Sequence, residues 1–111
     1  MTNSLHEKIE VVESGYEFLL AYAAQGRESD EGLDVRETLE KMATAAGEIS
    51  GGLAGSDFSD VVVDDARKAR AAIGLVLSQE RISSELVDNL NVSIHLRALL
   101  TDLFLLSETT K

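Results

Sequence analysis

The chain has 111 residues, with 20 acidic and 10 basic side chains that give a formal net charge of −10, and it contains no cysteine and no proline. So acidic a chain is a poor partner for nucleic acid, because neutralising phosphates supplies most of that affinity. Without cysteine there are no disulfides, no thiolate catalysis and no sulfur-ligated metal. The length predicts one domain, residues 1–111.

The beginning of the chain, MTNSLHEKIE, has neither the basic start nor the apolar run of a secretory signal. We therefore expect a cytoplasmic protein. The most apolar stretch, residues 96–106, contains Arg97 and Asp102 and is far shorter than the roughly 20 residues that span a bilayer. No membrane partner is expected.

Residues 4–25 are predicted to form the first helix. Ser4 and Glu7 have the S-x-x-E spacing of a capping box, which satisfies backbone N–H groups of the first turn. Gly26 follows as a residue suited to the left-handed conformation at a helix end. Apolar residues recur every three or four positions, as on one helical stripe: Leu5, Ile9, Val12, Tyr16, Leu19 and Ala23.

The second and third helices are predicted from the same spacing. The second begins just before Val35, with Asp34 as its cap, and ends near Ser50 in a glycine-rich loop. The third is capped by Asp57 or Ser59 and ends before the polar run QERISS. Their stripes contain Val35, Leu39, Met42, Ala46, Ile49 and Leu53 in the second helix, and Val62, Ala66, Ala69, Ile73 and Val76 in the third.

The last segment follows a cap at Ser83 or Ser84 and changes phase along its length. Leu86 and Leu90 do not share the stripe of the residues that follow, which are Val92, Leu96, Leu99, Leu103 and Leu106. A kink or a short helix before the main one would explain this change. The predicted fold is all-α, an antiparallel four-helix bundle with a broken or kinked last helix.

Two segments, YEFLLAYAA and LRALLTDLFLL, carry more apolar side chains than one stripe needs. A helix that is apolar all round is buried on several sides. Either these helices are central in the monomer, or their outer faces form a subunit interface. We favour the interface and predict a non-enzymatic, self-associating interaction or regulatory module, a homodimer. Its predicted surface comprises Tyr16, Phe18, Leu20, Tyr22, Leu99, Leu100, Leu103, Phe104 and Leu105.

Glu10, Glu13 and Glu17 recur at three- and four-residue spacing on the first helix. Like charges so placed destabilise a helix by a few tenths of a kcal/mol per pair. One interpretation is a solvated face that maintains solubility. The other is an acidic docking strip for a basic protein partner.

Two further functions compete with self-association. A small ligand could bind in a gap between the first and last helices, with Tyr16 and Tyr22 as polar groups in an apolar pocket. Alternatively, a helical bundle of this length with an exposed histidine resembles a histidine phosphotransfer domain, with His95 as the relay residue. That family shows H-x-L-K-G-S/A, whereas Leu96, Arg97 and Ala98 follow His95 and no glycine is present.

The histidines do not predict a metal site. His6 opens HEKIE, in which Glu10 occupies the place of the second histidine of the zinc motif H-E-x-x-H. A di-iron bundle needs E-x-x-H, but Asn3 and Val92 stand three residues before the two histidines. No metal and no cofactor are expected.

Overall fold

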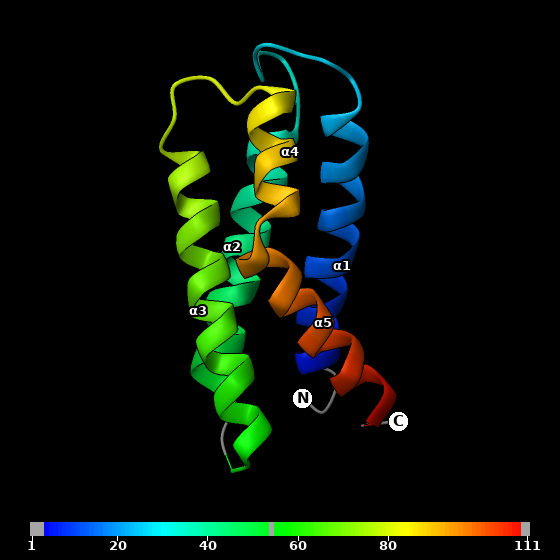
Figure 1. The fold of residues 1–111 in the computed structure, drawn as a ribbon, viewed down its shortest axis with the longest axis vertical. Coiled ribbons are helices and arrows are strands. Elements are labelled where there is room, and N and C mark those ends of the chain that lie inside the picture. The colour runs from blue at the N-terminus through cyan, green and yellow to red at the C-terminus, as the bar shows by residue number, and fades with distance from the viewer. Residues whose placement is uncertain (1–3, 54, 110–111) are drawn as a thin grey trace.

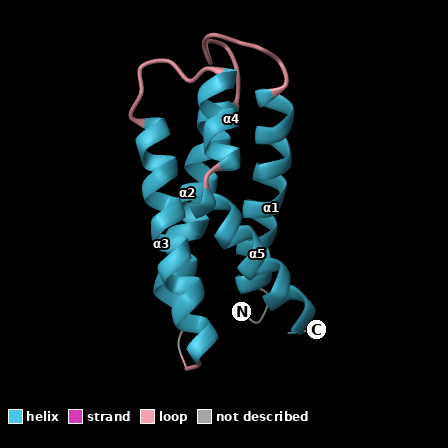
Figure 2. Cartoon of the chain, viewed as in Figure 1, coloured by secondary structure: helices cyan, strands magenta, loops and turns pink. Residues whose placement is uncertain are grey.

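A computed structural model describes residues 4–53 and 55–109, which fold into five helices without any strand (Figure 2). The all-helical prediction is confirmed for this part of the chain. The four-helix bundle is not confirmed, because the described residues contain five helices, two of them in the last segment, where a broken helix was predicted. The helices are α1 (Ser4–Ala23), α2 (Val35–Gly52), α3 (Asp57–Leu77), α4 (Ser84–Val92) and α5 (Ile94–Thr109).

Consecutive helices from α1 to α4 alternate in direction, and α5 continues in the direction of α4 (Figure 1). α2 packs against both α1 and α3, α4 packs mainly on α1, and α5 mainly on α3. The described residues therefore form an elongated body of 43 × 21 × 19 Å. The beginning of α1 and the end of α5 lie at the same end of this body.

Local sequence signals account for most helix ends. α1 begins at Ser4 as predicted and ends two residues early, and Gly26 has the expected positive φ, 69°. α2 begins at Val35 with Asp34 at the N-cap position, as predicted, but the Asp34 side chain makes no capping hydrogen bond. α3 is capped not by Asp57 or Ser59, as predicted, but by Ser56, whose hydroxyl accepts a hydrogen bond from the Ser59 amide at 3.1 Å.

The last segment breaks at Ser93. This residue has an extended backbone, φ −65° and ψ 144°, and its hydroxyl accepts a hydrogen bond from the Leu96 amide at 3.4 Å. Ser93 thus ends α4 and caps α5, and the two axes differ by 56°. The break explains the change of phase and leaves Val92 exposed, although the stripe predicted it to be buried.

No described helix is by itself long and apolar enough to cross a bilayer. The α4–α5 pair reaches the required length and apolar composition only when its two bent halves are taken together.

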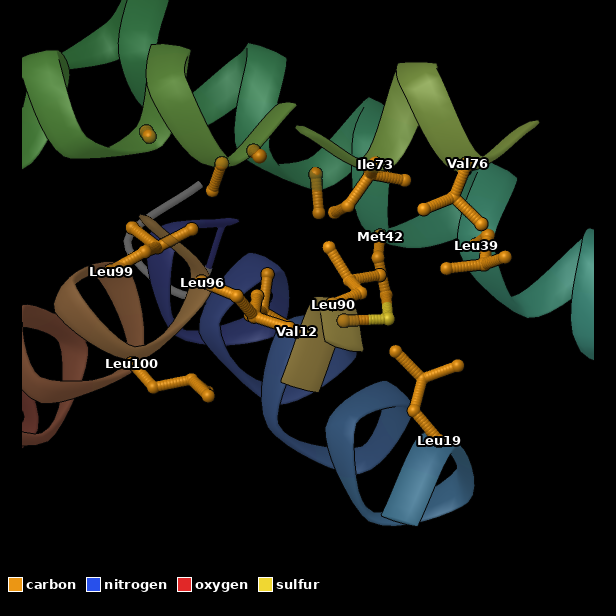
Figure 3. Packing of buried hydrophobic residues seen from close by; sticks show 14 of the residues in the cluster. Val12, Leu19, Leu39, Met42, Ile73, Val76, Leu90, Leu96, Leu99 and Leu100 are labelled. Atoms are coloured by element: carbon orange, nitrogen blue, oxygen red, sulfur yellow. The ribbon is translucent and has the colours of Figure 1, made fainter. Parts of the chain in front are cut away.

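The stripes of the five helices meet in one apolar core (Figure 3). All five predicted residues of α3 are buried, as are Val35, Leu39, Met42, Ala46 and Ile49 of α2. α1 and α2 approach closely at Gly15, where an added Cβ would lie 2.5 Å from Cγ of the fully buried Met42. Only glycine permits this packing of α1 on α2 without rearrangement.

Candidate functional site

The predicted interaction surface divides between the core and the exterior. Tyr22, Leu99, Leu100 and Leu103 are buried inside the monomer, so they are unavailable to an outer surface. Figure 3 shows Leu99 and Leu100 among the core residues. These four residues were therefore wrongly assigned to the surface. The spacing of apolar residues does not show which side of a helix faces inward, and α5 turns one side fully toward α1 and α3. The exposed members are Phe18, Leu20, Phe104 and Leu105, and Tyr16 is half-buried.

The exposed members do not form one patch. Phe18 and Leu20 are two residues apart, which turns them about 200° around the helix axis. Phe18 borders α2, since it lines a hollow together with Thr38 and Lys41. Leu20 consequently lies on the other flank of α1. These two side chains cannot belong to a single flat interface.

The hydroxyl of Tyr22 is hydrogen-bonded within the protein. It lies 2.7 Å from the Ile82 carbonyl and 3.2 Å from the Ser29 carbonyl, both acceptors. Burial, and next the negative charge of Asp30, raise the pKa of Tyr22, although Arg27 opposes them. The Ser84 hydroxyl donates to the Tyr22 carbonyl at 2.7 Å. Tyr22 therefore connects α1 to the start of α4 rather than offering a polar group to a ligand.

Asp30 and Arg36 join the loops at the same end. Arg36 Nε donates to Asp30 Oδ2 at 3.1 Å, and its Nη1 donates to the Leu77 carbonyl at 2.8 Å. Asp30 Oδ1 accepts from the Ile82 amide at 2.9 Å. Burial opposes ionisation of Asp30, but the hydrogen bonds from Ile82 and Arg36 outweigh it and lower the pKa of Asp30. These hydrogen bonds hold the two loops together, so we interpret the polar cluster as structural.

The outer face of α5 exposes several large apolar side chains. Ile94, Phe104 and Leu105 are 72%, 53% and 51% exposed. Ile94 and Leu105 are eleven residues apart, about three full turns, so they lie on one line along the helix. Ala98 and Thr101 lie between them on the same side. We call these five residues the α5 outer face.

Behind the α5 outer face, Asp102 is buried against α3 with only 7% of its surface exposed. Its Oδ2 atom has no hydrogen-bond partner among the described residues. Burial, reinforced by the neighbouring Asp65 carboxyl, raises the pKa of Asp102 to about 7. Sequence reasoning missed this pair, although an aspartate in the apolar run LRALLTDLFLL, next to the stripe residues Leu99 and Leu103, was the available signal.

The remaining candidates lie on the exterior. His95 is exposed in the first turn of α5, two residues after Ser93. Glu10 and Glu17 are exposed and Glu13 is half-buried, so the predicted acidic strip follows the outward side of α1. Among the described residues no group of three or more acidic or histidine side chains is arranged to hold a metal ion.

Comparison with protein-family models, with curated proteins and with solved structures finds no match to this chain. The described residues define the class of an all-helical protein with a divided last helix.

Proposed function

We propose that this protein is a non-enzymatic, self-associating interaction module that dimerises through the α5 outer face. The observation that carries the proposal is the exposure of Ile94, Phe104 and Leu105 on one short helix. Burying a fully exposed side chain of this kind contributes about 1.5–3 kcal/mol, and half or more of each of these side chains is still exposed in the monomer.

The spacing of the α5 outer face suits a second copy of the same helix. In a two-fold symmetric pair, both copies use the same surface, so a residue near one end of the contact meets a residue from the other end in the second copy. Two antiparallel α5 helices would then place Ile94 of one copy against Leu105 of the other. Ala98 would face Thr101 near the axis, where small side chains allow the helices to approach closely.

The distribution of charge also favours this face for contact between identical chains. Residues 1–57 contain 12 acidic and 4 basic side chains, whereas residues 58–111 contain 8 and 6. Repulsion between two copies is therefore weakest where their C-terminal halves meet. Arg97, exposed in the same helix, reduces the negative field further.

Sedimentation equilibrium tests the proposal. We expect the wild-type chain to form a dimer at micromolar concentration and Leu105→Asp to sediment as a monomer of 12.0 kDa. The matched control is Leu75→Asp, because Leu75 is 68% exposed on α3, outside the proposed interface. A wild-type monomer at high micromolar concentration, or equal loss of the dimer in both variants, would refute the proposed interface.

A second candidate function rests on the exposure of His95 at the start of α5. An exposed imidazole is accessible to a phosphoryl donor, as a relay residue must be. The lysine and glycine that follow the histidine in the phosphotransfer family have no equivalents here. Incubation with a sensor kinase and radiolabelled ATP tests this candidate: acid-labile label must appear in the wild type and disappear in His95→Gln.

A further inference from the structure

A groove with an apolar floor and an acidic rim runs between the outer flanks of α1 and α2. The groove encloses about 600 Å³. Val11 and Ala45 contribute apolar side chains to it. The carboxylates around it belong to Glu7, Glu37, Glu40 and Glu48. None of these acidic residues belongs to the predicted strip of Glu10, Glu13 and Glu17, which lies on the outward side of α1.

The groove extends along α1 into a second hollow. Val11 and Lys41 line both spaces, and the second is also lined by Gly15 and Phe18. Val11 and Phe18 lie seven residues apart, on the same side of the helix, and are 36% and 39% exposed. Gly15, where α1 contacts Met42 of α2, also lines the hollow between Val11 and Phe18. From Glu7 to Phe18 the groove follows about 16 Å of α1, or three helical turns.

The charges around the groove are predominantly negative. Two lysines, Lys8 and Lys41, accompany the four glutamates. The ammonium group of Lys41 lies 3.6 Å from the Glu37 carboxylate, so these two charges largely compensate each other. The remaining rim has three glutamates and one lysine, Lys8, so it is net acidic, on a chain whose formal net charge is −10.

The shape and the charge of the groove together indicate which kind of partner it can bind. A second copy of the chain would bring its own excess of carboxylates and be repelled. Anionic lipids and nucleic acids carry the same sign of charge. An amphipathic helix complements the groove. Its apolar residues at i, i+3 or i+4, and i+7 would contact Val11 and Phe18. Lysines or arginines on both sides of them would pair with the acidic rim.

We propose that the α1–α2 groove is a docking site for a basic amphipathic helix, about three turns long, of another protein. The site is on the opposite flank of α1 from Leu20 and does not involve α5. It is therefore independent of the proposed self-association, and either proposal can fail without the other.

Fluorescence anisotropy with a labelled synthetic helix tests the site. The probe is an amphipathic peptide of about four turns, with leucines along one face and lysines on both flanks. The control peptide has glutamates in place of the lysines. We expect the basic peptide to bind, with an affinity that falls as salt is added, and the acidic peptide not to bind.

Matched charge reversals locate the binding. Glu40→Lys with Glu48→Lys changes the groove, whereas Glu10→Lys with Glu17→Lys makes the same change in net charge on the outward side of α1. The groove variant should lose at least about tenfold in affinity and the control less than about threefold. Phe18→Ser should weaken binding by about tenfold, while Leu20→Ser on the other flank should not.

Thermal unfolding of every variant checks that each is folded before its affinity is compared. Three results would overturn the proposal. The basic peptide fails to bind at millimolar protein, or the acidic peptide binds equally well, or the two charge reversals weaken binding to the same extent. The last result would show attraction to the acidic chain as a whole rather than docking in the groove.

Discussion

Asp102 is the residue whose protonation most directly affects the packing of α5 on α3. Its carboxyl is buried beside Asp65, and Oδ2 lacks a hydrogen-bond partner among the described residues. Ionisation there would leave a charge without a counterion in an apolar setting, next to another acid. The neutral form therefore suits the folded state. An acidic surface residue such as Asp64, which is paired with Lys68 at 3.0 Å, behaves in the opposite way.

The stability of the protein should fall as the pH rises from about 4 to about 7. The pKa of Asp102 is about 7 in the folded chain and about 3.9 when unfolded, so the folded state binds more protons between these values. The stabilisation that protonated Asp102 gives the folded state is complete below pH 4 and has been lost once the pH has risen through 7. We expect a loss of roughly 1–3 kcal/mol between pH 5 and pH 8.

Urea unfolding of Asp102→Asn across this range measures the effect. In this variant the free energy of unfolding should depend less on pH, because the contribution of Asp102 is absent. Asp64→Asn serves as the control. The pKa of Asp64 is lowered by its hydrogen bond and charge interaction with Lys68, so its stabilisation is lost only in acid. An unchanged slope in Asp102→Asn would show that another group titrates.

At the level of helices, two small residues determine how elements meet. Ser93 ends α4 and caps α5, which allows α4 to lie on α1 while α5 turns toward α3. Gly15 allows α1 to contact α2 at Met42. By contrast, Gly74 in α3 is exposed and has no heavy atom within 4 Å of the Cβ it lacks. The same residue type therefore has a packing role in one helix and none in another.

Alanine at the two glycines should act in opposite directions. Gly15→Ala forces a methyl group against buried Met42 and should destabilise the fold by about 1–3 kcal/mol. Gly74→Ala meets no neighbour and should stabilise it by about 0.5–1 kcal/mol, because alanine loses less backbone entropy in a helix. Denaturant midpoints compare the two directly. Stabilisation of both variants would mean that α1 and α2 do not approach closely at Gly15.

At the level of the whole molecule, the apolar outer face of α5 and the acidic groove lie on different helices. The exposed apolar side chains of α5 lie in the less charged half of the sequence, whereas the acidic groove lies between α1 and α2. Our two proposals assign these surfaces to different partners. A second copy would cover α5, and a basic helix would occupy the groove.

Self-association should make thermal stability depend on protein concentration. Binding that occurs only in the folded state stabilises that state by mass action. A partner concentration of about one hundred times the dissociation constant adds about 2.7 kcal/mol to the free energy of unfolding. Wild-type Tm should increase with concentration in scanning calorimetry. The Tm of Leu105→Asp should stay constant. A wild-type Tm that does not move over that range would contradict dimerisation.

The apolar spacing was sufficient to predict the helices and the buried stripe of α3, and the cap signal at Asp34 was sufficient to predict the start of α2 at Val35. These features depend on side chains within a few turns of one another, so local sequence contains the information. The tertiary structure decided which sides of α1 and α5 face inward, and hence that Tyr22 and Leu100 are core residues while Phe18 and Leu105 are exposed. It also paired Asp102 with Asp65 and brought Glu7 and Glu48 to one groove. A helix with apolar residues on most sides can be buried in several orientations, and contacts between distant segments select among them.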